Sequence, residues 1–134
     1  MPTQRGFFAL KKVSLAALLT RYANGAPSSV EFVRFPAFEK SVAGLLSEAD
    51  ILDLEMLLVA HPHLGDLIPG GRGLRKLRRP AKGRGTRGGA RVIYYHVTSQ
   101  HLILLIVAFA KNERDDLDRR QLQILAHLVK SEFP

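Results

Sequence analysis

Cysteine is absent from this 134-residue chain, and its absence removes several kinds of site at once. Without thiols the chain can form neither a disulfide nor a thiolate metal site, and it offers no cysteine nucleophile. The absence fits the reducing cytoplasm, where we expect the protein to reside. No apolar run approaches the roughly 20 residues of a membrane-spanning helix. The longest such run, Leu102 to Ala110, has the length of a strand, and we expect no membrane association.

Acidic residues are missing from the whole stretch between Asp66 and Glu113, although ten of the chain's 20 basic residues lie there. These ten are Arg72, Arg75, Lys76, Arg78, Arg79, Lys82, Arg84, Arg87, Arg91 and Lys111. The rest of the chain carries ten basic against 12 acidic residues, so the net charge of +8 combines +10 in this stretch with −2 outside it. A surface that serves only to keep a protein soluble usually mixes positive and negative side chains. The one-sided block therefore favours a polyanionic partner over a merely solvated surface.

The first half of the chain has signals for one strand and two helices. Apolar and polar residues alternate from 30 to 35, which predicts a strand, and Pro36 suits the first turn of a following helix. Ser47 and Asp50 have the spacing of a capping box, so we expect a second helix to begin there. A proline biases the preceding residue away from helix, so this helix should end near His61-Pro62.

The second half predicts three strands and a final helix. We expect these strands at residues 74–79, 89–98 and 102–110. Residues 80–88, rich in glycine and arginine, would connect the first two strands, and Asp115 or Asp116 would cap the helix. Successive strands of a meander pair antiparallel, so the pattern indicates an α+β domain. Its small, curved, antiparallel-rich sheet would have helices packed on one face, followed by a C-terminal helix.

A chain of this length has room for one domain. We expect that domain to span residues 29–134. Residues 1–28 would be an N-terminal extension, either helical or disordered, because their apolar pattern is loose and ends at Gly25-Ala26-Pro27. Any chemistry must therefore lie on the surface of the single domain.

The most distinctive segments are 61–66, 73–78, 82–95 and Ala110-Lys111-Asn112-Glu113. In order and spacing they resemble the HigB-like toxins of the RelE superfamily, which belong to type II toxin–antitoxin systems. The resemblance implies a RelE-like domain and an mRNA interferase, an RNA endonuclease that usually cuts mRNA in the ribosomal A site, beside the 16S rRNA. It also implies a reaction without metal or other cofactor, in which a ribose 2′-OH attacks the adjacent phosphate. A cognate antitoxin protein would hold the toxin inactive, and whether the free chain forms a homodimer is left open.

The residues themselves favour the same chemistry. Attack by a 2′-OH requires activation of that hydroxyl, positive charge at the phosphate and a donor for the leaving 5′ oxygen. Clustered arginines and lysines can supply this charge, and a lysine beside other cations can share in proton transfer. The basic stretch contains no carboxylate pair and no histidine–acid combination for a metal. His61 and His63 bracket a proline, and we expect no metal there.

The resemblance implies four catalytic cations. They are Lys76, Arg78, Arg91 and Lys111. Residues two apart share a face of a strand, so Lys76 and Arg78 should project together. Arg91 would stabilise the scissile phosphate, Lys76 would help to activate the 2′-OH, and Lys111 would assist the leaving oxygen. Residues expected to bind RNA are Arg75, Lys82, Arg84, Arg87 and Tyr95. Well-studied members carry an arginine after the last lysine and a tyrosine beyond it. Asn112 stands here instead and no tyrosine follows, so the general acid and base are unassigned.

Two alternative functions fit the same pattern. A ParE-like toxin would share the fold but inhibit DNA gyrase without cutting RNA. The set of Lys76, Arg78 and Arg91 favours the nuclease, because gyrase poisons do not need it. A catalytically inactive RNA-binding homologue would need only the positive charge, since charge alone gives affinity without turnover.

Overall fold

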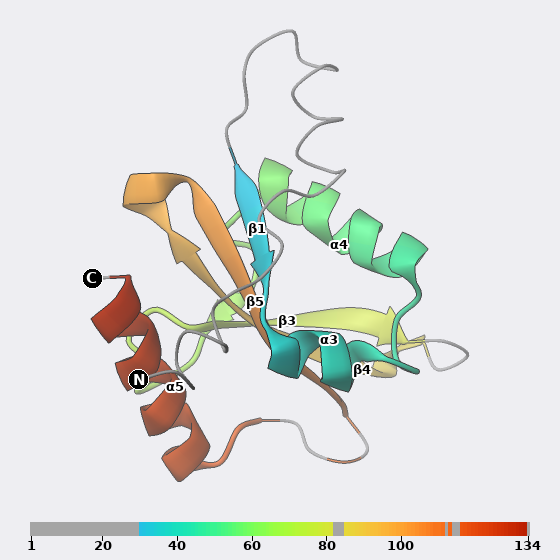
Figure 1. Ribbon diagram of the computed structural model, residues 1–134. Helices are drawn as coiled ribbons and strands as arrows, with labels where there is room; N and C mark the ends of the chain where they lie inside the picture. Colours follow the sequence, from blue (N-terminus) through green and yellow to red (C-terminus); the bar gives the residue numbers. More distant parts are fainter. Residues whose placement is uncertain (1–29, 82–84, 112, 114–115, 134) are drawn as a thin grey trace, which may run out of the picture.

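The computed structural model describes residues 30–81, 85–111, 113 and 116–133 (Figure 1). The extension expected at residues 1–28 therefore lies outside the described residues. The elements, in chain order, are β1 (Glu31–Arg34), α3 (Pro36–Val42), α4 (Glu48–Ala60), β2 (Asp66–Leu67), β3 (Arg75–Ala81), β4 (Gly85–Val97), the 3-10 turn η1 (Thr98–Gln100), β5 (Leu102–Ala110) and α5 (Arg119–Glu132). The predicted α+β class is confirmed. None of the helices in these described ranges is long and apolar enough to cross a membrane.

The five strands form one sheet in the order β1-β5-β4-β3-β2 (Figure 1). β2, β3, β4 and β5 pair antiparallel with their neighbours, whereas β1 runs parallel to β5. The predicted meander of three consecutive strands is thus confirmed. The two-residue β2, at one edge, has no counterpart among the predicted strands.

The helices lie on both faces of this sheet, so the expectation that they pack on one face is wrong. Tyr94 and Tyr95 are consecutive residues of β4 and therefore point to opposite faces. The Tyr94 hydroxyl donates to the carbonyl of Pro62, just after α4 (2.8 Å), whereas the Tyr95 hydroxyl accepts a hydrogen bond from Lys130 of α5 (3.0 Å). Figure 1 shows the sheet between α4 and α5. We call its two sides the α4 face and the α5 face.

β5 gives the physical reason for this arrangement. Its sequence, LILLIVAFA, is apolar throughout, and every residue except the half-buried Val107 is buried. A strand that is covered on both faces reads as a continuous apolar run instead of an alternating one. α5 is therefore needed on the α5 face, where it covers residues such as Leu102 and Leu104.

α4 begins as its capping box predicts. The Ser47 Oγ accepts from the Asp50 amide (3.1 Å), and the Asp50 carboxylate accepts from the Ser47 amide (3.0 Å). The helix ends at Ala60, with His61 as its C-terminal cap residue, again as predicted. It buries three apolar side chains and one acidic side chain against the α4 face. These are Ile51, Leu54, Glu55 and Leu58.

The expected boundaries are wrong at two places. The hairpin between β3 and β4 is much longer than predicted, since strand structure reaches Ala81 on one side and resumes at Gly85 on the other. Pro80 lies inside β3 because the pairing register shifts between Arg79 and Ala81, so that its missing N–H costs no ladder hydrogen bond.

The cap of α5 is Asp118, not Asp115 or Asp116. The Asp118 carboxylate accepts from the Gln121 amide (2.8 Å), and the Gln121 side chain accepts from the Asp118 amide (3.2 Å). This reciprocal pair satisfies two backbone donors at the start of the helix. Asp116 instead accepts from the amide of its neighbour Leu117 (3.1 Å).

Candidate nucleic-acid interface

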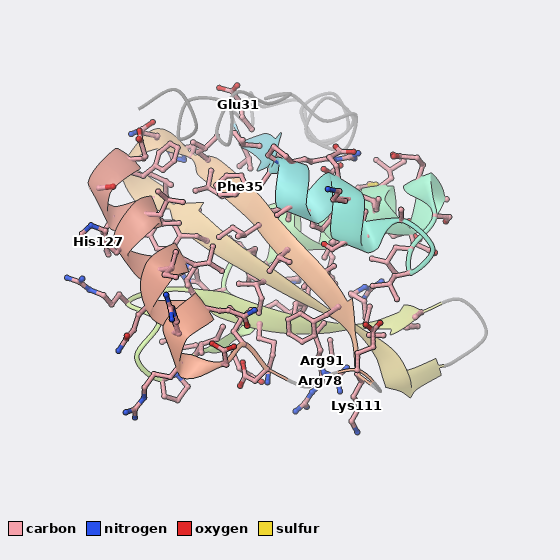
Figure 2. All side chains as sticks on the ribbon, turned by 60° about the horizontal axis from the view of Figure 1, so that its bottom comes forward. Glu31, Phe35, Arg78, Arg91, Lys111 and His127 are labelled. Carbon is pink, nitrogen blue, oxygen red and sulfur yellow. The ribbon has the colours of Figure 1, made fainter. Side chains whose placement is uncertain are left out.

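Three neighbouring strands bring predicted catalytic cations to the α5 face. Arg78 of β3 lies directly opposite Arg91 of β4, and Arg91 lies opposite Phe109 of β5. Side chains at directly opposite positions share a face, and Arg91 shares its face with Tyr95, four residues along β4. Lys111 follows two residues after Phe109. Figure 2 shows Arg78, Arg91 and Lys111 at the same end of the sheet.

Lys76 joins this group along β3, two residues before Arg78 and on the same face. Its ammonium lies 3.2 Å from the carboxylate of Asp116, which stands just before α5. The Lys76 side chain is only 13% exposed, whereas that of Asp116 is 48% exposed. We call Lys76, Arg78, Arg91 and Lys111 the cation row. Its four members are those predicted to be catalytic.

The members of the cation row differ in exposure. Arg78 and Lys111 are exposed, while Arg91 is only 2% exposed and is the one buried cation among the described residues. The Arg91 guanidinium donates to the carbonyl of Ala90 (3.3 Å). Residues directly opposite each other on one face can contact the same ligand, and guanidinium groups bind phosphate through charge-assisted hydrogen bonds. The arrangement therefore suits an anion held from both strands.

Not all of the predicted RNA-binding residues belong to this surface. Arg75 points to the α4 face, where its guanidinium donates to the carbonyls of Gly65 (2.7 Å) and His63 (3.2 Å) and holds the loop after α4. Tyr95 is on the α5 face but is half-buried, with its hydroxyl bound by Lys130. Lys82, Arg84 and the side chain of Arg87 lie outside the described residues. Asn112 lies outside them as well.

The loop after α4 is fixed by polar contacts that the sequence did not reveal. The buried Tyr94 hydroxyl accepts from the Gly65 amide (2.9 Å) as well as donating to the Pro62 carbonyl, and burial raises the pKa of Tyr94. Nearby, the His63 Nε2 and the His96 Nδ1 lie 3.1 Å apart. Burial, and then the neighbouring His63, lower the pKa of His96.

Metal-binding potential is limited on these surfaces. Within the described ranges, no three histidine, aspartate or glutamate side chains are grouped so that they could hold a metal ion. The pair of His63 and His96 supplies two nitrogens only. The cation row supplies no ligand, since its members are arginines and lysines.

Asp116 is the residue of this surface that sequence reasoning missed. The sequence predicts it only as a possible helix cap, and its contact with Lys76 spans 40 positions of the chain. The only feature of the sequence that could have indicated this contact is that Asp116 is among the first acidic residues after the basic stretch. No model of a known protein family matches the chain.

Proposed function

We propose that this protein is an mRNA interferase of the RelE superfamily, closest to its HigB-like branch, acting in the cytoplasm as the toxin of a type II toxin–antitoxin system. Its substrate is mRNA, cut on the ribosome, and its inhibitor is a cognate antitoxin. The observation that carries the proposal is the pairing of Arg78 with Arg91 on one sheet face, with Lys111 at the same end of the sheet (Figure 2). These residues lie far apart in the chain, so it is the fold that brings them together.

The reaction forms one bond to the scissile phosphorus and breaks another. The 2′ oxygen forms a bond to the adjacent phosphorus, and the bond from phosphorus to the 5′ oxygen breaks, leaving a cyclic phosphate and a 5′ hydroxyl. Arg78 and Arg91 would stabilise the charge on the non-bridging oxygens. The Lys76 ammonium would help to activate the 2′-OH by stabilising its alkoxide, and the proton of that hydroxyl passes to water. Lys111 would assist the leaving 5′ oxygen, which takes up one proton to become the 5′ hydroxyl.

Burial of Arg91 supports a specific role more than general charge does. A buried guanidinium has lost rotamer freedom and hydration before any ligand arrives, so its position is fixed by the surrounding protein. Arg78 faces it from the next strand and is exposed, so it can reach an incoming phosphate.

The test is primer extension on mRNA after the purified protein is added to a translating extract, with ribosomes present or removed. The critical variant is Arg78→Ala, and its matched control is Arg79→Ala, which removes the same charge from the next residue of β3 but from the α4 face. We expect cuts within codons that require ribosomes. Arg78→Ala should slow cleavage by about 100- to 1,000-fold, and Arg79→Ala should stay near the wild-type rate.

Two results would contradict the proposal. Equal loss in both variants would mean that net charge, and not the cation row, determines the activity. Intact mRNA with the wild-type protein would exclude the nuclease, and inhibition of DNA gyrase supercoiling by the same sample would then favour the ParE-like alternative. RNA binding without cuts would instead favour the inactive RNA-binding homologue.

A further inference from the structure

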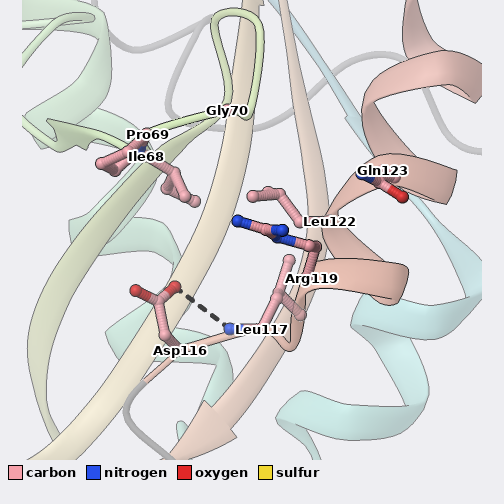
Figure 3. Close-up of a pocket in the computed structure, with 8 residues that line it drawn as sticks. All are labelled: Ile68, Pro69, Gly70, Asp116, Leu117, Arg119, Leu122 and Gln123. Atoms are coloured by element: carbon pink, nitrogen blue, oxygen red, sulfur yellow. Dashed lines mark hydrogen bonds between the residues drawn. The ribbon is translucent and has the colours of Figure 1, made fainter.

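A cavity of about 550 Å³ opens between the loop that follows β2 and the first turns of α5 (Figure 3). Its lining residues are Ile68, Pro69, Gly70, Asp116, Leu117, Arg119, Leu122 and Gln123. The two walls are close at the base of the cavity, where a Cβ on Gly70 would lie 3.9 Å from the Leu122 side chain. Gly70 has a positive φ of 77°, a conformation that lets the loop turn back along the helix.

The cavity adjoins the cation row. Asp116 lines it and also contacts Lys76 across 3.2 Å, so the wall of the cavity and the first member of the row are in direct contact. Lys76 and Arg78 are two residues apart on one strand, a spacing of about 6.7 Å. A chain of phosphates lying on the cation row would therefore bring the next nucleotide to the mouth of the cavity.

The lining chemistry fits a flat ring with polar edges. Ile68, Pro69 and Leu117 supply apolar walls, while the exposed side chains of Arg119 and Gln123 stand on the helix side (Figure 3). A guanidinium stacks on aromatic rings and donates from its edge, and a glutamine amide both donates and accepts. Among the described residues, neither of these two side chains has a hydrogen-bonding or ionic partner. A phosphate alone would not need the apolar walls.

We propose that this cavity receives one unpaired nucleobase of the RNA whose phosphates lie on the cation row. Arg119 stacks on the base, and Gln123 hydrogen-bonds its edge, in the way that single-stranded RNA is generally read. The inference rests on the proposed function in that both use the same RNA strand. It adds a positioning site, because a base held here sets which phosphate reaches Arg78.

The experiment measures the binding of a fluorescent, 2′-O-methylated RNA hexamer, which cannot be cleaved, and of the same hexamer with one abasic position at a time. The full chain is compared with Arg119→Ala, with Gln123→Trp, which fills the cavity, and with the matched control Arg120→Ala. Arg120 is exposed, adjacent and equally charged but does not line the cavity. Far-UV circular dichroism and thermal unfolding verify that each variant is folded.

We expect the wild-type protein to bind the intact hexamer about tenfold more tightly than the hexamer that is abasic at one particular position, a typical effect of losing one stacked base. Arg119→Ala and Gln123→Trp should lose that difference, whereas Arg120→Ala should keep it and lose only a general, salt-sensitive part of the affinity. If all abasic hexamers bind the wild-type protein as tightly as the intact one, or if Arg119→Ala and Arg120→Ala behave alike, the cavity holds no base.

The proposed function is tested separately by cleavage of mRNA. Cleavage by the wild-type protein without any abasic effect would overturn the cavity proposal and leave the nuclease standing. An abasic effect without cleavage would support the base site in a protein that binds RNA but does not cut it.

Discussion

Replacing Arg34 with methionine tests how the one buried acidic side chain of the described residues is compensated. Glu55 of α4 is fully buried, and Arg34 of β1 pairs with it through two contacts, Nε to Oε2 (3.1 Å) and Nη2 to Oε1 (3.2 Å). The Arg34 side chain is 17% exposed. Removing one partner of such a buried pair leaves a charge without compensation, which costs about 3–5 kcal/mol. The contact from Arg34 to Glu48 adds little, because that carboxylate is 78% exposed.

The loss should depend on pH. Burial raises the pKa of Glu55 above its ordinary value of 4.5, and the Arg34 guanidinium opposes this rise. Without Arg34 the folded-state pKa must rise further. A carboxyl group with a raised folded-state pKa contributes stability that is fully present below its unfolded-state pKa and is lost as pH rises through the folded-state pKa. The difference between variant and wild type should therefore be small near pH 4.5 and large at pH 7.

The assay is urea denaturation followed by far-UV circular dichroism at the two pH values. Glu48→Gln serves as the exposed control and should change the free energy of unfolding by less than about 1 kcal/mol. The double variant Arg34→Met with Glu55→Leu should regain most of the lost stability, because it buries no charge. A loss for Arg34→Met that is equal at both pH values, or a double variant as unstable as the single one, would refute this reasoning.

Three further changes probe the surroundings of the site. Tyr94→Phe removes a buried hydroxyl that bonds two backbone groups of the loop after α4. It should lower the free energy of unfolding, measured by urea denaturation, by about 1–3 kcal/mol. An unchanged midpoint would show that the loop keeps its place without this hydroxyl. The lowered pKa of His96, caused by burial and then by His63, means that stability present above pH 6.5 is lost as pH falls. His96→Gln should flatten this dependence in thermal melts, and an unaltered slope would assign it to other groups. Asp116→Asn removes one negative charge beside the cation row, so fluorescence anisotropy should show tighter binding of non-cleavable RNA. Stability should change by less than about 1 kcal/mol, and unchanged affinity would mean that this carboxylate does not limit binding.

Local signals in the sequence predicted most of the elements. The capping box of Ser47 and Asp50, and the turn before the apolar run Leu102–Ala110, each mark a boundary through contacts between near neighbours. The side to which each helix packs is not a local property. It depends on whether helices cover β5 on one face of the sheet or on both. An apolar run of nine residues is compatible with either a buried strand or part of a buried helix, so the run alone does not decide this.

Part of the candidate site could also be predicted from the sequence. Strand alternation predicts that Lys76 shares a face with Arg78, and the pairing register agrees. The meeting of Arg78 with Arg91 depends on the register of the β3–β4 hairpin, which was not predicted. The predicted ends of the two strands were wrong because both strands extend into the glycine- and arginine-rich connection. The contact of Lys76 with Asp116 could not be predicted, because it requires the placement of α5 on the second face.

The hydrogen bond from the Ala108 amide to the Ser41 hydroxyl (2.9 Å) has a consequence for the solubility of the protein. β1 pairs only with the first part of β5, from Leu102 to Leu105, and beyond that point α3 lies alongside the strand. An uncovered apolar strand edge is a template on which a second chain can add, the first step of edge-to-edge aggregation. Ser41 occupies an amide that such an added strand would need. The Ser41 hydroxyl, together with α3, thus covers the part of this apolar nine-residue strand that β1 leaves unpaired, and it leaves an added strand one backbone donor fewer to pair with.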